Sequence, residues 1–406
     1  MPEDDEQPRQ GRALEQGGVY VHRVDPAVVH AESARALQRR LPLAGLVLAV
    51  KDNIAVAGQP IGAGSATRAA APAEPCDAPV LARLRGAGAA LAGTVTMHEL
   101  ACGVTGVNAF AGTPANPAAP GCVPGGSSSG SAIAVAEGSA DLALGTDTGG
   151  SCRIPAAFCG VVGFKPAFGS YPVERVLALA PSLDCVGLLA REARHVAAAH
   201  RTLGGGGAIV AELPRRIGYS RAQAEAAHPV IGVRLEQLLG AVSALGCEVV
   251  EVRWPHDDDV FAIGTTIFLA EAAAQLGQLV ADPSHPLGED VRARLQTGLG
   301  IPAVDYISAS EQRVALRRSA LAVLAEVDCV IGPTVPILAP ALSDDVAVRT
   351  PEIVANTRFA NISGLPAISI PSPQRPPSGV QLIAAEDAAT IAHGIAIEAV
   401  LAGAGH

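Results

Sequence analysis

The chain has 406 residues, of which 49% are hydrophobic, 3% aromatic and 17% charged, and its formal net charge is -10. This length and hydrophobicity allow a large core, and the many small side chains favour an α/β fold packed without bulky aromatics. The negative charge and the absence of a basic stripe argue against a nucleic-acid-binding groove.

The first half of the chain shows alternating helix and strand patterns after a polar start. Residues 1–17 carry charge and few apolar side chains, which predicts a disordered tail before a single domain over residues 18–406. Helices are predicted at residues 26–40 and 79–88, and strands at 43–50 and 89–95. Residues 96–124 are rich in Gly, Pro and Asn and are predicted to be mostly loop.

The second half repeats this alternation, which supports an α/β fold. Strands are predicted at residues 186–190, 216–219, 247–252 and 327–331. Helices are predicted at residues 192–203, 230–245, 305–326 and 391–401.

One face of the helix predicted at 305–326 is basic. Tyr306, Ser310, Arg313 and Arg317 recur on that face at helical spacing. The face is either a solvated surface or a clamp for an acidic substrate, since arginine is well shaped to bind a carboxylate. Tyr306 and Arg313 are therefore candidate substrate-binding residues.

Two glycine- and serine-rich segments, residues 125–130 and 145–151, flank an apolar run. Within the run, 133–135 is predicted to be buried helix and 142–144 buried strand. Glycine before serine permits unusual backbone angles and leaves amide N–H groups uncovered, which suits a turn that presents a hydroxyl for acyl transfer. The alternatives are flexible loops and a phosphate-binding loop, but the Gly-Lys-Ser/Thr ending of a P-loop is absent.

Lysine is rare in this chain. Of 29 basic residues only Lys51 and Lys165 are lysine, so a lysine is expected where arginine cannot serve. Lys51 follows the apolar run 43–50, which should bury its stem. A buried amine can lose its proton whereas a guanidinium does not, so Lys51 is a candidate base. Biased codon usage, or an ion pair with Asp52, would explain the same residue.

Cysteine and histidine usage predicts neither disulfides nor a metal site. The eight cysteines are scattered without a CxxC pair, and the ten histidines do not cluster with them. The polar start MPEDDEQPRQG argues against a secretory signal, and no stretch approaches the roughly 18 apolar residues of a membrane helix. We expect a cytoplasmic protein without metal, cofactor, membrane contact or nucleic acid.

The run GGSSSGSA, followed by LALGTDTGGSCRIPAAFCGVVGFKP, resembles the amidase signature of the serine amidohydrolases. Similar pieces occur at residues 49–58 (AVKDNIAVAG), 328–336 (DCVIGPTVP) and 361–371 (NISGLPAISIP). The resemblance implies a three-layer α/β/α fold with a large, twisted, mixed central sheet covered by helices on both faces. It also implies hydrolysis of the C–N bond of a small-molecule amide.

The resemblance assigns a Ser–Ser–Lys triad. Ser151 would be the nucleophile, Lys51 the base, and Ser127 a proton bridge that follows a cis peptide bond with Gly126. Cys152 is a weaker candidate nucleophile, because a neighbouring side chain usually points away from the same site.

The resemblance also implies supporting residues around the triad. The oxyanion hole would use backbone N–H groups of Thr148, Gly149, Gly150 and Ser151. Ser128, Asp147 and Arg153 would support the segment that carries the nucleophile without contacting substrate. The acyl pocket would include Met97, His98 and Cys102.

Departures from known branches leave the substrate open. Malonamidase-like chains carry arginine three residues after the nucleophile, but Ile154 stands there. Low aromatic content disfavours long-chain lipid amides. The remaining alternatives are an amidotransferase component of the A type that needs partner chains and a catalytically silent binding protein. A homodimer is compatible with all of these.

Overall fold

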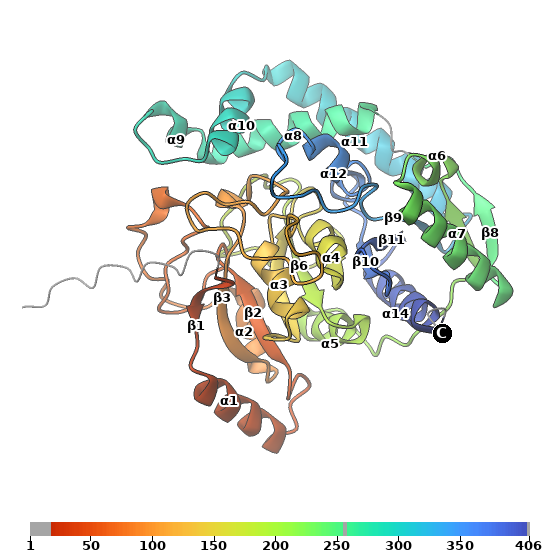
Figure 1. Cartoon of the computed structure of the whole chain (residues 1–406), viewed down its shortest axis with the longest axis horizontal. Coiled ribbons are helices and arrows are strands. Elements are labelled where there is room, and N and C mark those ends of the chain that lie inside the picture. The colour runs from red at the N-terminus through yellow and green to blue at the C-terminus, as the bar shows by residue number, and fades with distance from the viewer. Residues whose placement is uncertain (1–17, 255–257, 404–406) are drawn as a thin grey trace, which may run out of the picture.

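The computed structural model describes residues 18–254 and 258–403, so the tail predicted at residues 1–17 lies outside the described residues. A mixed sheet of eleven strands runs through the molecule in the order β1-β3-β2-β4-β6-β5-β10-β11-β9-β7-β8 (Figure 1). The strands are β1 (Tyr20–Arg23), β2 (Val47–Lys51), β3 (Ala90–Val95), β4 (Leu142–Asp147), β5 (Val162–Lys165), β6 (Cys185–Ala190), β7 (Arg216–Tyr219), β8 (Glu248–Glu251), β9 (Cys329–Pro333), β10 (Ala367–Pro371) and β11 (Gly379–Ile383).

Helices separate most of these strands. The α-helices are α1 (Pro26–Gln38), α2 (Pro79–Gly86), α3 (Ser129–Ala136), α4 (Arg153–Cys159), α5 (Ala193–Leu203), α6 (Arg221–Glu225), α7 (Pro229–Ala244), α8 (Asp258–Leu276), α9 (Gln278–Ala281), α10 (Glu289–Leu299), α11 (Ala303–Leu324), α12 (Thr350–Val354), α13 (Arg358–Ile362) and α14 (Asp387–Gly403). Short 3-10 helices cover Ala66–Arg68 and Glu99–Ala101.

Side chains along β2 alternate between two apolar cores. Leu48 and Val50 lie in the core shared with α2, α5 and α14. Ala49, together with Ala143 of β4, packs against α3 and α4 on the other side. Because successive side chains of a strand point to opposite faces, helices cover both faces of the sheet. The predicted three-layer α/β/α fold is confirmed.

The strand order brings two chain segments to one edge of the sheet. β2 pairs parallel with both β3 and β4, with Val50 opposite Leu144. The carboxyl ends of β2 and β4, at Lys51 and Asp147, therefore lie side by side. Ligands of open α/β sheets bind at the carboxyl ends of such strands.

Most predicted elements occur within three residues of their expected bounds, including α1, α2, α5, α7, α11, β6 and β7. The strand predicted at 43–50 starts only at Val47, because Leu46 N donates to Leu43 O at 3.1 Å and Gly45 has a φ of +90°. These turns use backbone groups that a longer strand would need for its ladder.

The long helix α8 was not predicted. It gathers with α10 and α11 at the top of Figure 1 and packs against both. Residues Asp259–Leu276 meet the length and composition criteria for a membrane span, which corrects the expectation that no such stretch exists. Half of this window is buried inside the protein, and core helices of folded proteins meet the same criteria.

Candidate active site

Lys51 lies at the carboxyl end of β2 and is wholly buried. Its Nζ donates hydrogen bonds to Ser127 Oγ at 2.8 Å and to Thr146 Oγ1 at 2.7 Å. Burial lowers the pKa of Lys51 from 10.5 to about 8, although nearby acidic groups partly oppose the shift. The structure therefore joins two of the three predicted triad residues by a hydrogen bond. The lowered pKa also leaves a fraction of the Lys51 amine neutral near physiological pH.

Ser127 is presented by a tight glycine turn, in which the Gly126–Ser127 peptide bond is cis. Gly125 has a φ of +78°, and a Cβ there would lie 2.9 Å from the Cα of Pro155. A Cβ on Gly126 would lie 2.7 Å from the backbone nitrogen of Gly106. These close approaches require glycine at both positions before Ser127.

Ser151 lies on the turn between β4 and α4 and is 4% exposed. Its carbonyl accepts a hydrogen bond from Ser128 N at 3.2 Å, which ties the two glycine-serine segments together. Within the described residues, no hydrogen bond joins the hydroxyls of Ser151 and Ser127. Catalytic hydrogen bonds are often long in the absence of substrate and tighten when it binds.

A buried ion pair fixes the turn that carries Ser151. Arg153 Nη2 lies 2.9 Å from Asp147 Oδ1, and neither side chain is exposed. Burial raises the pKa of Asp147, but the charge and hydrogen bonds of Arg153 outweigh burial and hold that pKa well below its ordinary value. Asp147 also accepts hydrogen bonds from Gly150 N at 2.9 Å and Cys152 N at 3.0 Å. Arg153 thus supports the turn and has its donors occupied inside the protein.

The same contacts revise the predicted oxyanion hole. The Gly150 N–H is already used by Asp147, so Gly150 is not available as a donor in this geometry. Among the described residues, the N–H groups of Thr148, Gly149 and Ser151 have no hydrogen-bond partner. These three donors remain on the turn beside the Ser151 hydroxyl.

Ser128 and Thr148 support the site through hydrogen bonds within the protein. Ser128 Oγ donates to Thr146 O at 3.1 Å. The Thr148 hydroxyl donates to Asp184 Oδ1 at 2.7 Å. Burial raises the pKa of Asp184, although the hydrogen bonds that it accepts from Thr148, Leu179 and Ala180 partly offset this effect. Cys152 is buried, which raises the pKa of its thiol and disfavours the thiolate that a nucleophile needs.

A small cavity opens beside Ser151. Thr148, Gly149, Arg294 and Arg358 line it together with Ser151. Neither arginine was predicted as a site residue. Arg294 lies on α10 and Arg358 at the start of α13. In a chain that uses arginine for nearly every basic residue, no local signal marks these two.

The residues predicted to contact substrate, Met97, His98, Cys102, Tyr306 and Arg313, do not line this cavity. Met97 is buried, and its carbonyl accepts a hydrogen bond from Asn108. His98 Nε2 lies 3.1 Å from Asp290 Oδ2. These residues are not among those that line the Ser151 cavity.

Tyr306 and Arg313 belong to a separate network on α11. Tyr306 donates to Glu271 at 2.9 Å, and Arg313 donates to Ser182 Oγ at 2.9 Å. Ser182 Oγ in turn donates to Glu271 at 2.5 Å. The helical spacing was interpreted correctly, but this face binds other parts of the protein and does not line the Ser151 cavity.

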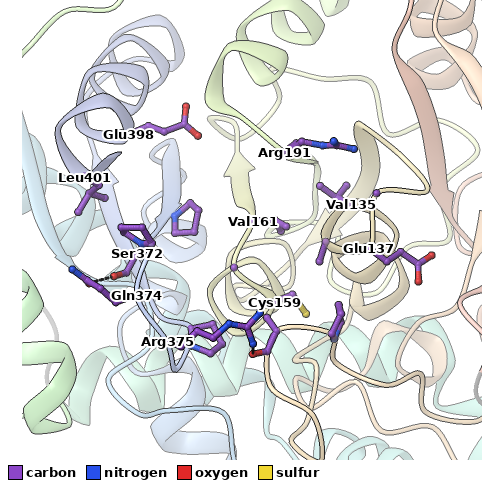
Figure 2. A pocket seen from close by; sticks show the side chains of 18 of the residues that line it. Val135, Glu137, Cys159, Val161, Arg191, Ser372, Gln374, Arg375, Glu398 and Leu401 are labelled. Carbon is purple, nitrogen blue, oxygen red and sulfur yellow. Dashed lines mark hydrogen bonds between the residues drawn. The ribbon is translucent and has the colours of Figure 1, made fainter. Parts of the chain in front are cut away.

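A second, more open pocket lies on another part of the molecule (Figure 2). Arg191 and Glu398 stand on its two sides, and Ser372 Oγ donates to Gln374 at 2.7 Å. Arg191 already pairs with Asp141, at 3.2 Å. None of the predicted catalytic residues lines this pocket. Within residues 18–254 and 258–403, no group of three His, Cys, Asp or Glu side chains is arranged to hold a metal ion.

Comparison with known proteins agrees with the signature motif. A family model described as Amidase matches residues 19–206 and 208–388. The chain is 34% identical over 401 residues to the A subunit of the glutamyl-tRNA(Gln) amidotransferase of Akkermansia muciniphila, with 88% of this chain and 84% of that protein covered. It is 35% identical over 389 residues to 2-amino-5-chloromuconic acid deaminase of Comamonas testosteroni, with 90% and 83% covered.

Comparison of the fold agrees with comparison of the sequence. A crystal structure of an amidase superposes on this chain with a TM-score of 0.85 and 34% sequence identity, and the match covers 94% of this chain and 91% of the amidase chain. The sequence motif, the matched residues and the architecture are therefore consistent with one another. This chain belongs to the amidase signature family.

Proposed function

We propose that the protein is an amidohydrolase that cleaves small amides through an acyl-enzyme on Ser151. The observation that carries this proposal is the buried hydrogen bond of 2.8 Å between Lys51 Nζ and Ser127 Oγ. A serine hydroxyl needs a neighbouring base, and an amine with a pKa of about 8 is partly neutral at physiological pH. Lys51 is therefore the base, and Ser127 carries protons between it and Ser151.

The first half-reaction forms the acyl-enzyme. Ser151 Oγ bonds to the amide carbonyl carbon while its proton passes to Ser127, and the Ser127 proton passes to the neutral Lys51 amine. The resulting oxyanion accepts hydrogen bonds from the N–H groups of Thr148, Gly149 and Ser151. Such a donor contributes about 2.7–4 kcal/mol at the transition state.

Breakage of the C–N bond completes the acyl-enzyme: Ser127 gives its proton to the leaving nitrogen and recovers one from Lys51, which becomes neutral again. In the second half-reaction, water attacks the acyl carbon and loses its proton along the same route, and Ser151 leaves with a proton, which releases the acid. Asp147 and Arg153 take no proton; their ion pair holds the turn in place.

Residues 18–406 are proposed to act as one domain. A single sheet recruits strands from Tyr20–Arg23 through Gly379–Ile383, and the proposed catalytic residues come from β2 and from segments that adjoin β4. A cut anywhere between β1 and β11 would divide the strands of this sheet between two pieces.

A second candidate function is that of the A-type component of an amidotransferase. It is favoured by the 34% identity to the Akkermansia muciniphila protein over most of both chains. In that role the released ammonia would pass to an acceptor held by partner chains. The role predicts that the chain copurifies with partners and that its amide hydrolysis depends on them.

Ammonia release from a panel of small amides tests the hydrolase proposal. We expect turnover by the isolated chain, and a fall of at least about 10⁴-fold in kcat for Ser151→Ala, as when other serine nucleophiles are removed. Ser129→Ala is the matched control, because Ser129 Oγ is buried without a hydrogen-bond partner among the described residues. Undiminished turnover by Ser151→Ala would rule the mechanism out.

A further inference from the structure

The Ser151 cavity contains a guanidinium that lacks an acidic partner. Arg358 lines the cavity and is only 8% exposed. Within the part of the chain that the structure describes, no carboxylate forms an ion pair with it. Burying a charge without an ionic partner costs free energy of folding. Contacts within the protein therefore do not by themselves account for Arg358 at this position.

Arg358 is held in place by neutral groups. Its Nη1 donates to Thr265 Oγ1, and the guanidinium carbon lies 5.0 Å from the ring centre of Phe261 and 5.9 Å from that of Phe268. Gly264 makes room for the stem, since a Cβ there would lie 2.5 Å from Arg358 Cδ. Aromatic rings and a hydroxyl orient the cation but do not neutralise it.

This cation lies next to the turn that carries the nucleophile. A Cβ built on Gly149 would lie 3.8 Å from Arg358 Nε. Thr357, the preceding residue, donates from its hydroxyl to Gly149 O at 2.8 Å. The guanidinium is therefore fixed relative to the proposed oxyanion donors, so any group that it binds is positioned relative to Ser151.

A second arginine lines the cavity but is already paired. Arg294 Nη1 donates to Asp290 Oδ2 at 2.7 Å and to Cys102 O at 2.8 Å. Burial, followed by the charge of Arg294, lowers the pKa of Arg358 to about 10, so Arg358 stays protonated at neutral pH. Two arginines therefore line the cavity, and of the two only Arg294 has a carboxylate partner among the described residues, that of Asp290.

We infer that the substrate is a short amide whose acyl part ends in a carboxylate, and that Arg358 binds this carboxylate. The inference rests on the proposed amide hydrolysis. Arginine forms paired, charge-assisted hydrogen bonds with a carboxylate. The acyl part stays bound to Ser151 through both half-reactions, so an anchor beside Ser151 acts on it throughout. The small cavity favours a short chain.

The test compares matched amides in an ammonia-release assay. The acidic probes are the monoamides of malonate, succinate and glutarate, and the neutral probes are amides of equal length that end in a methyl group. We expect wild type to prefer at least one acidic probe in kcat/KM, and Arg358→Gln to reduce that preference about 10- to 100-fold, the range for hydrogen bonds to charged groups. Arg358→Lys should keep part of it.

Arg318→Gln is the matched control, because Arg318 is an exposed arginine on α11, and its acid-to-neutral ratio should equal that of wild type. Thermal melting checks that each variant folds. If Arg358→Gln does not fold, carboxylate binding can still be tested in two ways with folded protein. One is the acid-to-neutral ratio of Arg358→Lys, and the other is inhibition of neutral-amide hydrolysis by succinate in wild type. Succinate should inhibit wild type, more strongly at low salt, and dimethyl succinate should not.

The inference and the proposed function fail in different ways. Hydrolysis of neutral amides that depends on Ser151, with no preference for acidic probes and no inhibition by succinate, would overturn the inference alone. A preference for acids that is equal in wild type and Arg358→Gln would also overturn it. If no amide is hydrolysed, or if Ser151→Ala is as active as wild type, the proposed function itself is wrong.

Discussion

Lys51 Nζ and Ser127 Oγ lie 2.8 Å apart, and neither side chain is exposed to solvent. Lys51 comes from a sheet strand and Ser127 from a glycine turn 76 residues later in the chain. Because water is excluded from both, the charge on the amine is poorly solvated and its proton is more easily lost. The proposed base and proton carrier are thus assembled before a substrate binds.

Replacing Lys51 with methionine removes the proposed base while keeping the length and apolar stem of the side chain. We expect Lys51→Met to lower kcat about 10²- to 10⁴-fold, the contribution typical of a positioned base. The melting temperature should stay the same or rise, because a poorly solvated charge has been removed. Steady-state ammonia release and thermal melting measure the two effects. An active Lys51→Met variant would assign the base elsewhere.

The activity should rise with pH. Lys51 acts only when neutral, and its pKa of about 8 lies above neutral pH. Below pH 8, kcat/KM should therefore increase about tenfold per pH unit and then level off. The profile of kcat/KM against pH for a neutral amide tests this. A profile that is flat between pH 6 and 9, or one that falls, contradicts the assignment of Lys51.

Breaking the buried Asp147–Arg153 pair should destabilise the protein. Asp147→Asn leaves the Arg153 charge buried without its partner, and such losses cost about 3–5 kcal/mol of unfolding free energy. Urea unfolding measures the change. Arg194→Met in the exposed Glu192–Arg194 pair is the control, with an expected change of about 1 kcal/mol or less. Equal effects at the two pairs would show that the buried pair is not structural.

Gly150 should not accept a side chain. Its φ is +125°, and a Cβ there would collide with Thr357 Oγ1. Gly150→Ala should therefore distort the Ser151 turn and lower both kcat and stability. Gly240→Ala is the control, since Gly240 lies within α7 with nothing near its missing Cβ. That change should stabilise the helix by about 0.5–1 kcal/mol. Full activity of Gly150→Ala would show that the turn tolerates a side chain.

The parts of the site that were predicted from sequence lie in contiguous motifs. The apolar run before Lys51 and the glycine turns around Ser127 and Ser151 depend on neighbouring residues, so local sequence carries their structure. The alternation of helices and strands gave the α/β class for the same reason. The hydrogen bond from Gly150 N to Asp147 Oδ1 was not predicted. It depends on the direction in which the Asp147 side chain points, which local sequence does not determine.

The substrate cavity could not be predicted from local patterns. Arg294 and Arg358 come from separate helices, and tertiary packing alone brings them to the same cavity. Spacing on α11 did identify Tyr306 and Arg313 as sharing one face, but spacing does not say which neighbour that face meets. It meets Glu271 of α8, a helix whose apolar residues are too evenly spread to show an amphipathic pattern.

Activation of Ser151 by Lys51 through Ser127 is measured most directly by the rate at which a fluorophosphonate labels Ser151, followed by intact mass and peptide mapping across pH 6 to 9. We expect one label per chain, on Ser151, at a rate that rises with pH through about 8 in wild type. The rate should fall at least about 100-fold in Lys51→Met and Ser127→Ala. Labelling of another residue, or equal rates in wild type and both variants, would contradict a nucleophile activated by Lys51 through Ser127.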